Sequence, residues 1–397
     1  MTNTANITTV IRNAAVVLCD DIRRVDIGMR GGKIDCIGEA LTGYQAEIDA
    51  DGCTVIPGMI DIHTHGAVRV DCNGASAADL QTLSLFFASV GVTGFYPSII
   101  CDAEERMIAA TRTVSQARSQ VRGAAILGCH LEGPFLSSAY KGAMPLSYLQ
   151  RCNPALISAI AEAAGDCPLR MTVSPSAEGA ASLIHSLVAQ GVQVSLGHSD
   201  ADYEQTSCCL RVGATSFTHV MNAMRPLDRR EPGILGAALE SDAACEFICD
   251  GLHLHPANIR LLLKSKGIGR LIGISDSIMA TGLSDGTYRL GTQQITVTGD
   301  NAMLTDGTTR AGSLLTLHKA LQNLMRFTGL PMEYAVLPFT RNPAELMGLD
   351  KQKGRIAVGM DADLTVLDAR MNIAYTFVGQ RLVYQSPDNQ PGTQNNK

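Results

Sequence analysis

Residues 59–98, MIDIHTHGAVRVDCNGASAADLQTLSLFFASVGVTGFYPS, contain two short apolar runs on either side of a stretch with helical periodicity. The runs at 59–63 and 92–98 are largely apolar on both faces, as are the strands of a buried parallel sheet. Residues 78–90 between them place apolar side chains at the spacing of an amphipathic helix. The stretch therefore predicts a strand, a helix and a second strand.

The same alternation continues to residue 275. Six more apolar runs cover 125–131, 169–173, 192–197, 214–219, 245–249 and 271–275. Helix-like stretches between the runs include 103–120, 155–164, 180–190 and 256–264. A doubly wound open sheet alternates in the same way, but eight runs with polar residues after them favour a parallel (β/α)8 barrel. We therefore expect an α/β fold with a TIM-like barrel over residues 57–347.

Both ends of the chain are rich in short strands. Residues 1–56 alternate Val and Ile between Gly-Gly and Asp-Gly turns, and strand-like stretches return within 348–385. We expect these two segments to form one small β-rich domain, a β-sandwich, beside the barrel. Before the returning strands, a short hairpin insertion is predicted at 290–306 and helices at 314–328 and 332–347.

The composition excludes several classes of protein. Lys and Arg number 32 against 38 Asp and Glu, so the chain lacks the basic excess of a nucleic-acid-binding protein. No apolar run reaches the roughly 18 residues of a membrane helix, and the N-terminus lacks the pattern of a signal peptide. Twelve cysteines without Cys-x-x-Cys spacing indicate reduced core thiols in a cytoplasmic protein.

Histidines and carboxylates follow six of the eight runs. They are His63, His65, Glu132, His198, His219, His253 and Asp276. Because barrel active sites lie at the C-terminal ends of strands, we expect these side chains to converge. Each of them alone would more often be a hydrogen-bonded core residue or a helix cap, but their joint placement predicts a metal site. Imidazole and carboxylate ligands suit Zn, Fe, Mn or a similar divalent ion.

A divalent ion at a barrel mouth lowers the pKa of water and so suits hydrolysis of an amide or an ester. Such a reaction needs a group that takes up and returns a proton. Asp276, at the end of the last run, is the candidate for this general acid/base. The chain contains no G-x-S-x-G elbow and no G-x-x-x-x-G-K-[ST] loop, so neither a serine hydrolase nor a phosphate-loop protein is indicated.

Several motifs resemble those of the N-acetylglucosamine-6-phosphate deacetylases, which are metal-dependent amidohydrolases. They span nearly the whole chain and include PGMIDIHTHG at 57–66, HLEGPF at 130–135, GHS at 197–199, THVMNAM at 218–224, REPG at 230–233 and DGLH at 250–253. The resemblance implies hydrolysis of N-acetyl-D-glucosamine 6-phosphate to D-glucosamine 6-phosphate and acetate. The alternatives are a related amidohydrolase on N-acetylgalactosamine 6-phosphate or another acylated amine, and a non-enzymatic barrel used for binding.

The resemblance also implies roles for individual residues. Glu132, His198 and His219 would hold the principal ion, and His63 and His65 allow a second, so we expect one or two ions per subunit. Asp276 would be the catalytic acid/base. Contacts to the phosphorylated amino sugar are expected from Ala143, Asn222, Ala223, Arg230, His253 and Ala311. Asn222 and Ala223 would hold the phosphate, and Arg230 would reach the phosphate in a neighbouring subunit, which implies a homodimer.

Two segments depart from the family pattern. After residues 141–143, where the family usually has a histidine that contacts the sugar, this chain has Met144 followed by Pro145. A thioether cannot donate a hydrogen bond as an imidazole can. A later substrate segment, usually Leu-Ser-Gly-Ser, reads Arg310-Ala311-Gly312-Ser313. These changes concern the choice of sugar rather than the type of reaction.

Overall fold

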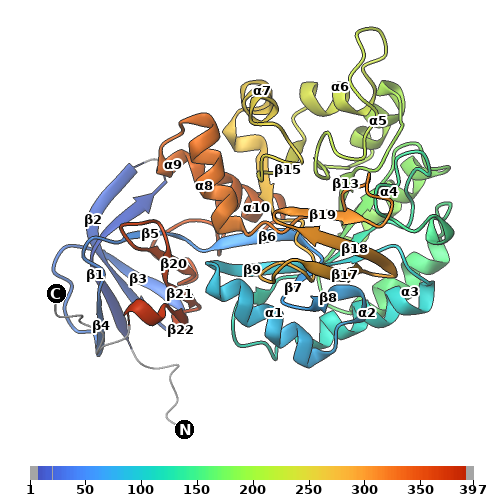
Figure 1. The fold of residues 1–397 in the computed structure, drawn as a ribbon. Coiled ribbons are helices and arrows are strands. Elements are labelled where there is room, and N and C mark those ends of the chain that lie inside the picture. Colours follow the sequence, from blue (N-terminus) through green and yellow to red (C-terminus); the bar gives the residue numbers. More distant parts are fainter. Residues whose placement is uncertain (1–7, 20, 390–397) are drawn as a thin grey trace.

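The computed structural model describes residues 8–19 and 21–389, which form a barrel and a smaller sheet beside it (Figure 1). The barrel strands are β6 (Met59–Thr64), β9 (Val92–Ile100), β11 (Cys129–Glu132), β12 (Leu169–Val173), β13 (Gln193–Leu196), β14 (Ser216–Phe217), β15 (Ala244–Ile248) and β16 (Leu271–Ile274). Each pairs in parallel with the next one named. Past the end of β16, the Asp276 amide donates to the His63 carbonyl at 2.9 Å and so joins the last strand to the first. The predicted barrel is confirmed.

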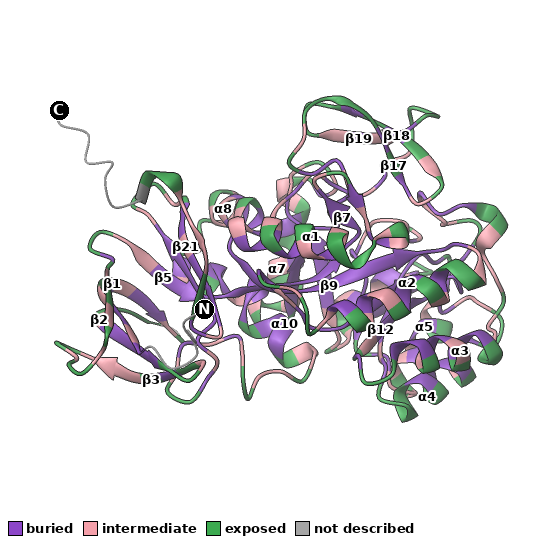
Figure 2. Ribbon diagram, turned by 90° about the horizontal axis from the view of Figure 1, so that it is seen from below, coloured by how far each residue is buried: buried purple, intermediate pink, exposed green. Residues whose placement is uncertain are grey.

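Helices surround the strands in the order expected from the sequence (Figure 1). They are α1 (Ala77–Ser89), α2 (Glu104–Ala117), α3 (Pro154–Ala164), α4 (Ala180–Ala189), α5 (Tyr203–Arg211), α6 (Gly233–Glu240), α7 (Pro256–Lys266) and α8 (Leu317–Thr328). In α1, Ser76 and Asp79 form a capping box that satisfies the first backbone donors, and Leu80, Leu83 and Phe87 face the core. Figure 2 shows β9 buried along its whole length, whereas the helices expose their outer sides. No helix in the described ranges is both long and apolar enough to cross a bilayer.

Three predicted segments differ in detail. The run at 125–131 divides into β10 (Ala125–Ile126) and β11, because its register against β9 shifts by one residue between Ile126, opposite Phe95, and His130, opposite Ser98. The helix predicted at 332–347 divides into α9 (Met332–Ala335), a 3-10 turn and α10 (Arg341–Leu346), since Pro338 lacks the donor that would continue a helix. The predicted hairpin is a three-stranded sheet of β17 (Gly286–Leu290), β18 (Gln293–Thr298) and β19 (Asn301–Leu304), which Figure 2 shows outside the helical layer.

The second large sheet contains both ends of the described chain (Figure 1). Its strands are β1 (Thr9–Leu18), β2 (Asp21–Arg30), β3 (Lys33–Gly38), β4 (Ala46–Asp49), β5 (Thr54–Pro57), β20 (Leu364–Leu367), β21 (Ile373–Val378) and β22 (Arg381–Gln385). Strand β5 joins the two ends, because it runs parallel to β1 on one side and antiparallel to β20 on the other. Ile11 and Ile27 from the N-terminal strands pack with Leu364 and Phe377 from the C-terminal strands, which gives the small sandwich its own core. The domain boundaries, 1–56 with 348–385 and 57–347, stay a prediction.

A buried ion pair lies inside the barrel. Arg170 on β12 and Glu246 on β15 are fully buried, and the Arg170 Nη2 group donates to a Glu246 carboxylate oxygen. The Arg170 Nε group also donates to Gln193 Oε1 at 2.8 Å. Because a buried charge is costly without a partner, each member of this pair depends on the other.

Arg170→Met is expected to lower the free energy of unfolding by about 3–5 kcal/mol, since it leaves the Glu246 charge buried with only the longer contact to His63 Nδ1, at 3.5 Å. Urea denaturation followed by circular dichroism measures the loss. The double variant Arg170→Met/Glu246→Leu removes both charges and should regain much of the lost stability. A single-variant loss below about 1 kcal/mol would show that the pair contributes little.

Candidate metal centre

Six buried side chains meet at the C-terminal mouth of the barrel. His63 lies in β6 and His65 directly follows it, Glu132 ends β11, and His198, His219 and Asp276 follow β13, β14 and β16. They form two groups, His63–His65–Asp276 and Glu132–His198–His219, in each of which the nitrogen and oxygen atoms lie within 4.8 Å of one another. The sequence-predicted metal ligands and the predicted acid/base are therefore brought together.

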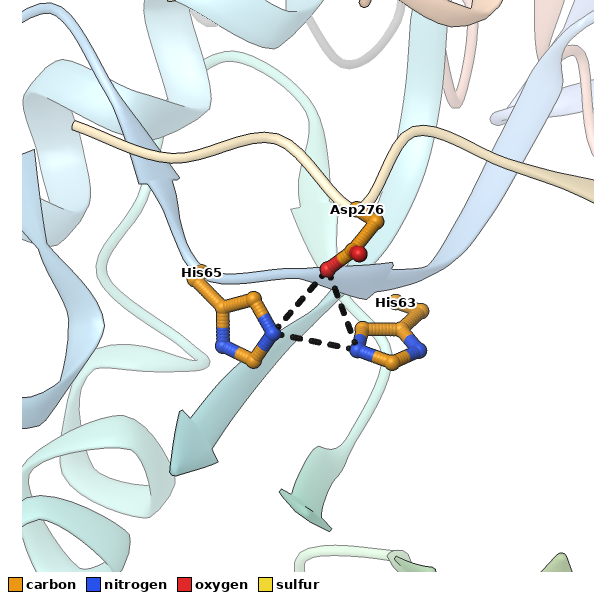
Figure 3. A group of neighbouring side chains, drawn as sticks. All are labelled: His63, His65 and Asp276. Carbon is orange, nitrogen blue, oxygen red and sulfur yellow. Dashed lines mark hydrogen bonds and ion pairs between the residues drawn. The ribbon is translucent and has the colours of Figure 1, made fainter. Parts of the chain in front are cut away.

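The first group joins the first strand of the barrel to the last (Figure 3). The Nε2 atoms of His63 and His65 are 3.1 Å apart. Asp276 Oδ1 lies 3.4 Å from His63 Nε2 and 3.1 Å from His65 Nε2. Because side chains two apart on a strand point to the same face, His-x-His presents both imidazoles to this carboxylate.

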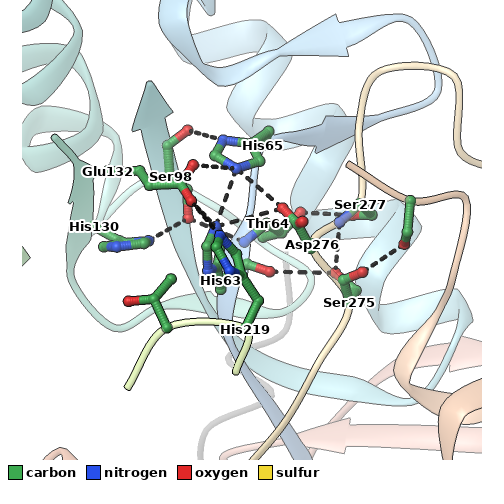
Figure 4. A network of polar contacts seen from close by, with 12 residues as sticks. His63, Thr64, His65, Ser98, His130, Glu132, His219, Ser275, Asp276 and Ser277 are labelled. Carbon is green, nitrogen blue, oxygen red and sulfur yellow. Dashed lines mark hydrogen bonds and ion pairs between the residues drawn. The ribbon is translucent and has the colours of Figure 1, made fainter. Parts of the chain in front are cut away.

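The second group is centred on Glu132. Its Oε1 atom lies 3.0 Å from His198 Nε2 and 2.9 Å from His219 Nε2. Glu132 also contacts the first group, with Oε2 3.1 Å from His65 Nε2 and Oε1 3.5 Å from His63 Nε2. Figure 4 shows Glu132 beside the imidazoles of His65, His63 and His219. One carboxylate is thus shared by both groups.

The protonation of the imidazoles fits a bound cation. His65 Nδ1 lies 3.2 Å from the Ser98 carbonyl oxygen, and His198 Nδ1 lies 3.1 Å from the Tyr140 carbonyl oxygen. A carbonyl only accepts, so Nδ1 carries a proton and Nε2 is the nitrogen that a metal ion can take. His198 Nε2 is also only 3.1 Å from His219 Nε2. Converging lone pairs and carboxylates are the donor set that divalent metal ions take in proteins.

The charges of the cluster lead to the same conclusion. Burial alone would raise the pKa of Glu132, but His63, His198 and His219 hold that pKa well below its usual value. Burial likewise acts against the lowered pKa of Asp276, which His63 and His65 maintain. Burial lowers the pKa of His65, yet Asp276 and Glu132 raise it to about 10. The pocket therefore favours a positive charge beside its carboxylates. A proton on His65 supplies that charge when no ion is bound, and a metal ion that displaces the proton would supply it instead.

Several residues of the site have unusual backbone conformations. His198, His219 and Asp276 have positive φ angles of 48°, 29° and 49°, and Met221 and Ala223 have 73° and 49°. Such conformations cost free energy in residues with a Cβ and cluster at functional sites. Here they turn the chain at the ends of β13, β14 and β16, where the side chains enter the cluster.

A cavity of about 220 Å³ opens beside both groups. Among the residues that line it are Ala143, Asn222, Ala223 and His253, together with five of the six cluster residues. His253 Nδ1 lies 2.6 Å from Asp250 Oδ2, which fixes the imidazole ring. Four of the predicted substrate contacts thus surround one space.

Two predicted substrate residues do not line this cavity. Arg230 is exposed in the loop before α6, and its amide donates to Asp228 Oδ1 at 2.8 Å. Ala311 is fully buried between Arg310 and Gly312, and these two neighbours line the cavity in its place. The small side chain of Ala311 packs into the core instead.

Four residues in or beside the site were assigned no role from the sequence. Thr309, Arg310 and Leu290 reach the cavity from the three-stranded sheet, and only the departure of residues 310–313 from the family pattern marked that segment. Asp61 is fully buried and accepts hydrogen bonds from the amides of His63 and Ser275, each at 3.3 Å. Burial raises the pKa of Asp61 to about 6. The sequence does place Asp61 two residues before His63, and this spacing could have indicated that Asp61 lies near the site.

Comparisons with known proteins identify relatives of this chain. The sequence model of the Amidohydrolase family matches residues 54–390. The N-acetylglucosamine-6-phosphate deacetylase of Bacillus subtilis (strain 168) is 33% identical over 387 residues, which cover 95% of this chain and 98% of that protein. A deacetylase structure from Pasteurella multocida superposes with a TM-score of 0.91 at 28% identity and covers 96% of this chain and 100% of that one. A Mycobacterium smegmatis mutant in complex with N-acetyl-D-glucosamine-6-phosphate gives 0.88 at 30% identity, with the same coverage.

Proposed function

The chain belongs to the amidohydrolase family and, within it, to the N-acetylglucosamine-6-phosphate deacetylases, and on this basis we propose how it acts. The protein hydrolyses the N-acetyl amide of N-acetyl-D-glucosamine 6-phosphate to D-glucosamine 6-phosphate and acetate. The proposal rests mainly on one observation. The Glu132 carboxylate contacts the imidazoles of both groups, and it lines the same cavity as Asp276. The relatives favour this sugar over the N-acetylgalactosamine epimer.

Two sets of residues would hold metal. Glu132, His198 and His219 would bind the principal ion, and His63 and His65 would bind a second, so each subunit takes one or two divalent ions of the Zn, Fe or Mn kind. The contacts of Glu132 with all four imidazoles support this assignment. When bound, such an ion lowers the pKa of water and polarises a carbonyl oxygen.

Asp276 would move the proton of the reaction. Its carboxylate accepts a proton from the attacking water as the new C–O bond forms at the acetyl carbon. It then gives that proton to the amide nitrogen as the C–N bond breaks, which releases acetate and the free amine. The contacts of Asp276 Oδ1 with His63 Nε2 and His65 Nε2 support the role, because they place the carboxylate at the proposed metal site.

The remaining residues would bind and orient the sugar. His253, fixed by Asp250, would contact the substrate near the scissile amide. Asn222 and Ala223 would hold the phosphate. Arg230 would complete the phosphate site of a neighbouring subunit in a homodimer, and its exposed position outside the cavity of its own chain supports that role. We place the enzyme in the cytoplasm.

A substrate screen with metal analysis tests the function. Acetate release is measured from N-acetylglucosamine 6-phosphate, N-acetylgalactosamine 6-phosphate and unphosphorylated N-acetylglucosamine, with metal content determined on the same sample. We expect the first substrate to have the highest kcat/KM, and we expect chelation to abolish activity until a divalent ion is restored. Full activity in metal-free protein, or no release from any of the three sugars, would refute the proposal.

Arg230→Ala is expected to raise KM for the 6-phosphate substrate by about 10- to 150-fold, the equivalent of one charge-assisted hydrogen bond. KM for the unphosphorylated sugar should change much less. Steady-state kinetics on both sugars measure the difference. Arg229→Ala, which removes the neighbouring exposed arginine, is the matched control and should leave both values unchanged. Equal losses on the two sugars would show that Arg230 acts only through the structure of its loop.

A further inference from the structure

Arg310 gives the cavity a fixed positive charge. Within the described part of the chain, it is the one arginine or lysine among the residues that line the cavity. Its side chain is half-buried, between the lining residues Thr309 and Gly312. The other cationic candidate, Arg230, is exposed and lies outside the lining.

The position of Arg310 is set by the three-stranded sheet. Its backbone forms an antiparallel bridge with Met303 on β19. On either side, the Leu304 amide donates to the Thr309 carbonyl at 2.8 Å and the Ala311 amide donates to the Ala302 carbonyl at 3.1 Å. The guanidinium is therefore carried on a hydrogen-bonded strand edge rather than on an unanchored loop.

The side-chain partner of Arg310 is neutral. The Nη1 group donates to Asn301 Oδ1 at 2.6 Å, which uses one of the five N–H donors of a guanidinium. No Asp or Glu in the described ranges forms an ion pair with it. The cavity carboxylates, Glu132 and Asp276, are instead in contact with the imidazoles of the metal groups. The Arg310 guanidinium, which Asn301 orients and which lines the cavity, is therefore suited to bind an anionic group of the substrate.

Part of the cavity lining has no side-chain hydrogen-bond donors. Ala143, Met144 and Leu290 line the same cavity and offer no side-chain donor to a sugar oxygen. Arg310 is therefore the one Lys or Arg side chain that an entering acidic group meets among the described lining residues of this chain. A guanidinium binds two oxygens of a phosphate or a carboxylate at once, which gives orientation as well as affinity.

We propose that Arg310 binds an oxyanionic group of the amino-sugar substrate within its own subunit and so selects acidic N-acetylated sugars. The inference rests on the proposed function and adds a specificity residue to it. The oxyanion is either the 6-phosphate or a carboxylate elsewhere on the sugar, and both present the same pair of oxygens to the guanidinium.

Kinetics of Arg310→Met on three substrates test the proposal. N-acetylglucosamine 6-phosphate carries the phosphate, N-acetylmuramic acid carries a carboxylate without phosphate, and N-acetylglucosamine carries neither. KM should rise by about 10- to 150-fold for an acidic substrate and by less than about threefold for the neutral one. The acidic substrate with the larger rise identifies the group that is bound. Arg289→Met, an exposed arginine on β17 of the same sheet, is the matched control and should change nothing.

Direct binding separates this inference from the proposed function. Inorganic phosphate and acetate are titrated by calorimetry into the wild type and into Arg310→Met, which needs no turnover. Weaker binding of either anion to the variant supports the proposal, even if none of the sugars is hydrolysed. Arg310→Lys keeps the charge and should recover part of the affinity if the methionine variant folds poorly. Unchanged anion binding, or an equal rise of KM on the neutral and acidic sugars, would overturn the proposal.

Discussion

Asp276→Asn should fold, keep its principal metal and bind substrate, while kcat falls by about 10²- to 10⁴-fold or more. Asparagine has nearly the same shape as aspartate but cannot carry the proton from water to the amine. The backbone at residue 276 should tolerate the change, since its φ of 49° lies in the left-handed region that Asn accepts readily. The hydrogen bonds that the residue 276 backbone makes with His63 and Ser313 remain available.

The measurement is kcat of a folded, metal-loaded variant, with metal content and the unfolding midpoint determined on the same preparation. If Asp276 served only to shape the chain after β16, asparagine would cost little in rate or stability. A kcat within about threefold of the parent corresponds to about 0.65 kcal/mol of barrier and would remove Asp276 from the mechanism.

Glu132→Gln should lose both metal and activity, because this carboxylate contacts the imidazoles of both groups. A neutral amide leaves those nitrogens without the negative charge that helps to hold a cation. Removal of the ion takes several kcal/mol from transition-state stabilisation, so kcat/KM should fall by about 10³-fold or more. Elemental analysis of the dialysed protein measures the metal directly.

The two variants form a matched pair. Asp276→Asn should retain the principal ion and lose turnover, whereas Glu132→Gln should lose the ion first and turnover as a result. Excess divalent metal should therefore restore part of the activity of Glu132→Gln and none of the activity of Asp276→Asn. Stoichiometric metal and normal kcat/KM in Glu132→Gln would show that the carboxylate is not a ligand.

Strand periodicity and strand-end chemistry were enough to predict the barrel and the residues that meet at its mouth. Parallel strands bring their C-terminal ends to one edge, so His63, Glu132 and His219 could be expected together despite their separation in sequence. The break between β10 and β11 could not be expected, because it depends on a one-residue shift in their register against β9. The short helices after residue 331 could have been expected, since Pro338 is visible in the sequence.

Parts of the site depend on tertiary contacts that no local pattern encodes. The positive φ angles of His198 and His219 are imposed by the surrounding structure, because an isolated histidine rarely adopts them. The contacts of Glu132 with both groups depend on the rotamer of one side chain between four imidazoles. Arg310 reaches the cavity only because the three-stranded sheet packs over the mouth, whereas Ala311, next to it, turns into the core.

The place of β5 between β1 and β20 determines when the protein can be completed during its synthesis. Strands β1 and β5 leave the ribosome before the barrel exists, and the second edge of β5 has no partner until Leu364–Leu367 has been made. Pairing between strands so distant in the chain is slow, and an unpaired strand edge is a template for another polypeptide. The small sheet can therefore close only after residues 364–367 have been made, when most of the chain has already been synthesised.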